Sequence, residues 1–133
     1  MAFPTTTARL TNLSGDTAML VSSTYDTAPK KIRSEKTATF TQNISTNMLG
    51  TVVYNIGSIV TWIILWTSDN KVTTWIVPYG EPIFWKNIWD TLEPNNAQYS
   101  YTTDYNEIYT STVDISSTGD AQTLNATITH AYA

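Results

Sequence analysis

The fold of this chain is decided by the stretch TVVYNIGSIVTWIILW at residues 51–66. Two runs of β-branched and aromatic residues, which favour strands, flank the turn signal Gly57-Ser58. In the second run the even-numbered residues from Val60 to Trp66 lie on one face, and Ile63 and Leu65 lie on the other. A strand that is apolar on both faces is either central and covered twice or turns one face toward a ligand. We therefore place this hairpin at the centre of the molecule.

Further short apolar runs precede and follow the hairpin, and turn-forming residues separate them. Ser14-Gly15-Asp16, Ser68-Asp69-Asn70 and Thr118-Gly119-Asp120 are three such turns. Short strands at this spacing are typical of a sandwich or barrel. The predicted strands are Ala8–Leu13, Ala18–Ser23, Thr37–Ile44, Thr51–Ile56, Val60–Trp66, Val72–Val77, Thr110–Ser116 and Thr123–His130.

The composition favours the same fold class. Charged residues make up only 14% of the chain, whereas about one residue in five is threonine, which suits strands better than helices. The 133 residues match the usual size of one domain, and the absence of cysteine excludes a disulfide framework and a thiolate metal site. We expect a single all-β domain over residues 1–133, an antiparallel β-sandwich.

One segment, residues 81–92, departs from the strand pattern. Its apolar side chains recur at helical spacings of three and four: Trp85, Ile88, Trp89 and Leu92. The segment predicts one short helix of about three turns, and Pro82 fits its first turn. An isolated helix of this length is unstable in water, so we expect it to pack on the sandwich through its tryptophans. Trp62 and Trp85 are predicted to lie in the core.

Residue types that form catalytic, metal-binding or nucleic-acid-binding sites are scarce in this chain. The formal net charge is −4, which disfavours nucleic acid because that affinity comes from many Lys and Arg side chains. The single histidine, His130, lies in an alternating strand and is interpreted as an edge-of-core residue rather than a general base. There is no Gly-rich phosphate loop and no metal-ligand cluster. We expect a binding protein that is not an enzyme and needs no cofactor or metal.

Aromatic residues are the most prominent chemical feature, with five Trp and eight Tyr. In the segment Tyr99–Tyr109, four tyrosines alternate with small polar residues, a composition typical of contact surfaces. Tyrosine faces attract quaternary ammonium groups by cation–π interaction, and they also stack on sugars. A hairpin whose outer face is rich in tyrosine explains the segment equally well, so three interpretations remain open.

Several short motifs occur in a characteristic order along the chain. They are Asn12-x-Ser14-Gly15, Pro29, Ile32, Thr37-Ala38-Thr39-Phe40, Gly50-Thr51-Val52-Val53-Tyr54, Trp62-Ile63-Ile64-Leu65-Trp66-Thr67 and Trp89-Asp90 with Leu92. In this order they resemble the actinoporin-like β-sandwich group, closest to the jasmonate-induced protein and nakanori-type lipid-binding family. The resemblance implies a sandwich flanked by short helices that recognises phosphocholine headgroups, notably sphingomyelin, at one end.

The resemblance also implies a position for the ligand site. Trp66 and Thr67 fall where such proteins place headgroup residues at the end of a central strand, although Ser68-Asp69 replaces an expected proline. The tyrosine segment lies roughly where the group carries its tyrosine cluster. The candidate ligand-binding residues are Trp66, Thr67, Ser68, Tyr79, Tyr99, Tyr101 and Tyr105.

The first functional hypothesis is recognition of a membrane-lipid headgroup by a peripherally bound protein. The first predicted strand begins at about Ala8, which leaves no room for the N-terminal helix with which actinoporins pierce membranes, so we expect binding without lysis. Met1–Leu10 has no signal-peptide pattern, and we expect a cytoplasmic protein or one released by another route.

Two alternatives remain. The first is a carbohydrate-binding lectin on the same sandwich, in which aromatic rings stack on a pyranose. Asp104, Asn106 or Asn70 would then bind its hydroxyl groups. The second is a structural or defence-related protein whose aromatic patch is buried in a homodimer.

Overall fold

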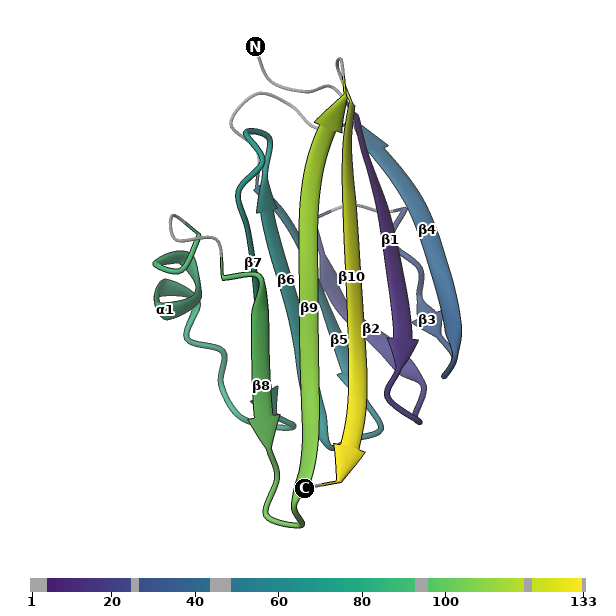
Figure 1. The fold of residues 1–133 in the computed structure, drawn as a ribbon, viewed down its shortest axis with the longest axis vertical. Helices are drawn as coiled ribbons and strands as arrows, with labels where there is room; N and C mark the ends of the chain where they lie inside the picture. Colours follow the sequence, from purple (N-terminus) through teal and green to yellow (C-terminus); the bar gives the residue numbers. More distant parts are fainter. Residues whose placement is uncertain (1–4, 25–26, 44–48, 93–95, 119–120, 133) are drawn as a thin grey trace.

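The computed structural model describes residues 5–24, 27–43, 49–92, 96–118 and 121–132. The strands are β1 (Thr5–Leu13), β2 (Ala18–Ser23), β3 (Lys31–Ile32), β4 (Lys36–Asn43), β5 (Leu49–Ile56), β6 (Val60–Thr67), β7 (Val72–Pro78), β8 (Gln98–Thr102), β9 (Glu107–Thr118) and β10 (Ala121–Tyr132), and the helix is α1 (Trp85–Trp89). Two five-stranded sheets have the orders β4-β1-β10-β9-β8 and β3-β2-β5-β6-β7. The sheets pack face to face, and α1 lies outside the second sheet (Figure 1). The predicted β-sandwich with one short helix is confirmed.

The predicted strands are all present, with ends that shift by a few residues. Three residues of the predicted elements lie outside the described residues: Ile44 of a predicted strand, and Gly119 and Asp120 of a predicted turn. Neighbouring strands are antiparallel except β1 and β10, which run parallel to each other. A parallel pair cannot be joined by a hairpin, and here the whole intervening chain connects the two strands.

Two short strands, β3 and β8, were not predicted. The tyrosine segment forms a hairpin, β8–β9, as the third interpretation expected, but without the expected tyrosine-rich outer face. The orientation differs from that interpretation, because Tyr99 and Tyr101 pack against the core whereas Gln98 and Ser100 face outward. The outer face of this hairpin is therefore polar and carries little tyrosine.

The β5–β6 hairpin lies in the middle of its sheet and is covered on both faces. Its inner face packs on the other sheet, where Trp62 is fully buried and its Nε1 donates a hydrogen bond of 2.7 Å to Ser111 Oγ. On its outer face Val53, Ile63 and Leu65 form a second buried cluster with residues of the α1 segment. Of the two explanations for a strand that is apolar on both faces, double coverage is confirmed.

The helix is present but shorter than the predicted three turns. It spans five residues, and the chain continues in tighter turns, in which the Thr91 N–H donates to Ile88 O and the Leu92 N–H to Trp89 O. Trp85 does not lie in the core as predicted, because 36% of it is exposed. A helix this short buries only one side, and Ile88 occupies that side.

Trp66 depends on the glycine opposite it. Gly50 pairs with Trp66 across β5 and β6, and an alanine Cβ at residue 50 would lie 2.1 Å from Trp66 Cε2. No atoms fit at that distance, so the buried indole occupies space that only glycine leaves open.

We expect Gly50→Ala to lower the free energy of unfolding by about 1–3 kcal/mol through overpacking. Urea denaturation measures this loss. In a Trp66→Leu background the same substitution should cost clearly less, because the colliding ring atoms are gone. Equal costs in both backgrounds would show that the two residues do not interact in this way.

Candidate functional site

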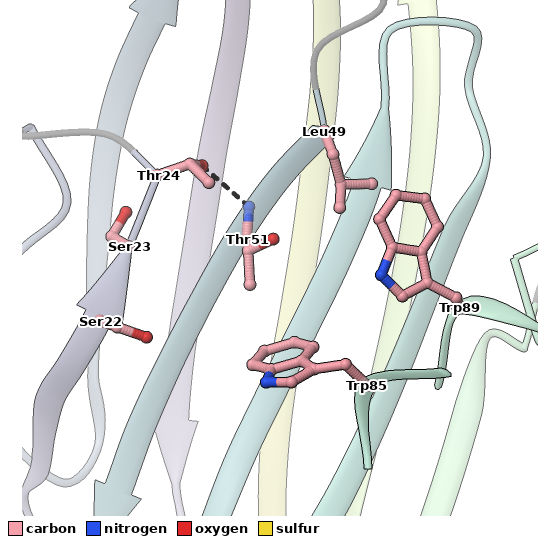
Figure 2. A pocket seen from close by; sticks show the side chains of 7 residues that line it. All are labelled: Ser22, Ser23, Thr24, Leu49, Thr51, Trp85 and Trp89. Atoms are coloured by element: carbon pink, nitrogen blue, oxygen red, sulfur yellow. Dashed lines mark hydrogen bonds between the residues drawn. The ribbon is translucent and has the colours of Figure 1, made fainter. Parts of the chain in front are cut away.

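The position of α1 is set by its buried side. Ile88 is fully buried and Leu92 nearly so, and both pack on the outer face of the β5–β6 hairpin. Trp85 and Trp89 are four residues apart and therefore lie along one flank of the helix. Because Ile88 faces the sheet, this flank is turned toward β5 and β2 (Figure 2).

The two indoles form one wall of a pocket of about 400 Å³, which we call the tryptophan groove. Both rings are accessible, with 36% of Trp85 and 48% of Trp89 exposed. Figure 2 shows them facing the side chains of β2 and β5 across the groove. The groove is lined by Ser22, Ser23, Thr24, Leu49, Thr51, Trp85 and Trp89.

The rest of the lining combines four hydroxyl side chains of the β2 and β5 region with the apolar side chain of Leu49. The pairing of β2 with β5 is irregular between Leu20 and Ser22, where the register shifts. Beyond it, the Thr24 N–H donates to Thr51 O at 3.1 Å, and Thr24 Oγ1 accepts from the Thr51 N–H at 3.0 Å. The Thr24 hydroxyl retains its own hydrogen for donation, since a hydroxyl is both donor and acceptor.

No charged side chain is among the groove's described lining residues. The groove therefore offers flat apolar ring faces on one side and neutral hydrogen-bonding groups on the other. Such a combination suits an uncharged ligand that has an apolar face and several hydroxyl groups.

A second pocket, of about 380 Å³, lies between the β8–β9 and β5–β6 turns, and we call it the turn pocket. It combines two aromatic rings with two carboxylate groups, a chemistry different from that of the tryptophan groove. Its lining residues are Ser58, Ile59, Tyr101, Thr103, Asp104, Tyr105 and Glu107.

The structure does not bring the seven predicted ligand-binding residues together. Trp66 is fully buried between the sheets, so its ring does not reach the surface, and Ser68 is also buried. Thr67 is half-buried and its Oγ1 donates to Asp69 Oδ1. Tyr79 is exposed but lines neither pocket described above.

The tyrosines of the β8–β9 hairpin divide between two environments. Tyr99 stacks on Trp75 of β7 with ring centroids 4.4 Å apart. Its pKa is raised mainly by burial and further by the charge of the neighbouring Tyr101. Tyr101 and Tyr105 both line the turn pocket, together with Asp104, which the lectin hypothesis named. Two of the predicted ligand-binding residues thus lie in the same pocket.

The tryptophan groove was not predicted as a site. The helical spacing of Trp85 and Trp89 was visible, but it was interpreted as a core-facing stripe. No signal in the sequence argued against this interpretation, because the spacing predicted about three helical turns, whereas the helix spans five residues. One helical turn cannot bury Ile88 and both indoles on the same surface, so some of them must remain accessible.

His130 has the environment that the sequence predicted. It is partly buried at the end of β10, where its Nε2 lies 2.8 Å from Glu107 Oε2 and its ring packs on Tyr109. Within the described ranges, no three potential metal-ligating side chains converge on one point. No helix in those ranges is both long and apolar enough to cross a bilayer.

Comparison with solved structures identifies the fold. The wild-type lectin of Xerocomus chrysenteron superimposes with a TM-score of 0.58, covering 97% of this chain and 100% of the lectin at 13% sequence identity. A triple methionine variant of the same lectin gives a TM-score of 0.57 with 97% and 99% coverage, also at 13% identity. At this identity the likeness shows the β-sandwich fold alone.

The comparisons by sequence found no relative. No family model matches the chain, and no curated protein matches it. The resemblance to jasmonate-induced and nakanori-type proteins in particular therefore has no support beyond the shared sandwich.

Removing the buried anchor of α1 should disturb the tryptophan groove. We expect Ile88→Ala to cost about 2–5 kcal/mol of stability and to loosen α1, so that a small quencher reaches Trp85 and Trp89 more easily. Fluorescence quenching and urea denaturation measure the two effects. Asn87→Ala, at an exposed neighbouring position, is the control. Unchanged quenching and stability in Ile88→Ala would refute the role of this anchor.

Proposed function

We propose that this protein is a lectin and that the tryptophan groove holds an uncharged sugar. The observation that carries the proposal is the pairing of two half-exposed indoles with four hydroxyl side chains of Ser and Thr residues. Soluble proteins rarely leave large aromatic rings clustered at the surface unless the rings meet a partner.

A pyranose ring has two kinds of surface. Its C–H groups form an apolar face, and its hydroxyl groups project around the edge. An indole offers a large flat apolar surface for the first. The side chains of Thr24 and Thr51 lie across the groove from the indoles (Figure 2), and their hydroxyl groups would hydrogen-bond the second, Thr24 as a donor because its oxygen already accepts from the Thr51 N–H. The polar contacts would fix the orientation of the sugar, and the rings would supply most of the contact area.

The fold supports the same function. The solved structures described above, which share the sandwich over nearly the whole chain, are lectins by name. A fold does not determine a function, because functions reside in sites. Here the site chemistry and the fold comparison favour the same class of ligand.

A phosphocholine headgroup fits the groove less well. Phosphate is usually held by Arg, Lys or several backbone N–H groups, and no basic side chain is among the lining residues. The residues expected to hold the headgroup are dispersed, and Trp66 is buried. We also propose binding without catalysis, since neither a carboxylate nor an imidazole is among the groove's described lining residues.

We expect single substitutions Trp85→Ala and Trp89→Ala each to weaken sugar binding about tenfold, which corresponds to the loss of about 1.4 kcal/mol of contact. A glycan array would identify the sugar, and calorimetric titration would measure its affinity. Phe84→Ala is the matched control, because Phe84 is 65% exposed beside the same helix and does not line the groove. This variant should bind normally.

Vesicles that contain phosphocholine lipids, with and without sphingomyelin, are tested on the same preparation. Vesicle binding that sugars do not inhibit, with no glycan bound, would overturn the proposal in favour of lipid recognition. Sugar binding that survives both tryptophan substitutions would show that the groove is not the site.

A further inference from the structure

The turn pocket lies far from the tryptophan groove. Thr51 of the groove is near the start of β5, and Ser58 of the turn pocket follows its end, so roughly 20 Å of extended strand separates them. In Figure 1 the β8–β9 turn lies at the end of the sandwich at which β10 ends, whereas α1 lies beside the middle. One small ligand cannot occupy both pockets.

The turn that carries the pocket is held by its own hydrogen bonds. The Thr103 N–H donates to Glu107 O at 2.8 Å, and Thr103 Oγ1 accepts from the N–H groups of Tyr105 and Glu107 at 3.2 Å each. Asn106 closes the turn in the left-handed region with φ of 61°. Tyr105, which is 83% exposed, is thus presented by an ordered turn.

The charge of the pocket is one-sided. Asp104 and Glu107 contribute carboxylates, and no Lys or Arg is among the described lining residues. Glu107 Oε2 lies 2.8 Å from His130 Nε2, whereas no described Lys or Arg forms an ion pair with the exposed Asp104. An anionic ligand such as phosphate would be repelled here.

The neighbouring Tyr109 reports the same negative potential. Its pKa is raised to about 12, most of all by burial and further by the carboxylates of Glu107 and Asp16, which disfavour another negative charge. Asp16 lies against Gly57, directly beside the Ser58 that lines the pocket. Carboxylates from two different turns, Asp16 after β1 and Asp104 and Glu107 at the β8–β9 turn, therefore lie at this end of the sandwich.

We propose that the turn pocket is a second ligand site, which holds the ammonium group of an organic cation between Tyr101 and Tyr105 with Asp104 as counter-ion. The faces of tyrosine rings carry negative charge density and attract a cation. The carboxylate adds Coulomb attraction, and the hydroxyl groups of Ser58 and Thr103 are available to bind polar substituents. This site does not depend on the proposed lectin function of the tryptophan groove.

Two pairs of probes test the site, and in each pair only the charge differs substantially. The first pair is glucosamine and glucose. The second pair is choline and 3,3-dimethylbutan-1-ol, the uncharged alcohol in which a carbon atom replaces the nitrogen of choline. Amide NMR titration of the full chain reports where each probe binds, since the signals of residues 103–107 and those of Thr51 and Trp85 are distinct. We expect at least one cation to bind about tenfold more tightly than its uncharged counterpart, with shifts confined to the turn pocket.

The preferred cation identifies the source of the ammonium group, an amino sugar or a quaternary amine. We expect Tyr105→Ala and Asp104→Asn each to weaken that cation about three- to fivefold. Asp114→Asn, at an exposed carboxylate of β9 outside the pocket, should have no effect, and neither should Trp85→Ala. Equal binding of charged and uncharged probes, or shifts confined to the tryptophan groove, would overturn the proposal.

Discussion

The outer face of the β5–β6 hairpin is apolar and has to be covered, and the surface chemistry of this protein depends on that constraint. Val53, Ile63 and Leu65 are fully buried there, and the α1 segment covers them with Ile88 and Leu92. Full burial of one such side chain contributes about 1.5–3 kcal/mol, whereas a five-residue helix has no stability of its own in water. Packing therefore fixes α1, and the fixed helix places its two indoles opposite the hydroxyl groups of β2 and β5.

Local pattern was sufficient for much of the fold. The alternation in residues 51–66 specifies two strands and a turn, and its doubly apolar half correctly indicated a strand covered on both sides. The pattern did not specify which side chains of residues 81–92 face the sheet, because spacing places Trp85 and Ile88 on nearly the same stripe. Only the geometry of a single short turn of helix decides that Ile88 is buried and that the tryptophans remain accessible.

The sites were harder to predict because they join distant segments. The groove brings the end of β2, the start of β5 and α1 together, and nothing local marks Ser22 or Thr51 as members. The turn pocket is partly local, and two of the predicted tyrosines, Tyr101 and Tyr105, are among its lining residues. Tyr99 was predicted for the same set, but it does not line the turn pocket; its ring stacks on Trp75 of the facing sheet, a contact that no sequence spacing reveals. Two pockets of contrasting charge would let one chain contact two different groups at once.

A crystal structure of the protein with the sugar that binds most tightly tests the central claim most directly. We expect a pyranose ring to lie flat against Trp85 or Trp89, with its hydroxyl groups bonded to side chains of β2 and β5. The side chains should barely move, because Ile88 already holds the helix in place. A sugar found elsewhere on the sandwich, with both indoles still exposed to water, would contradict the assignment of the groove.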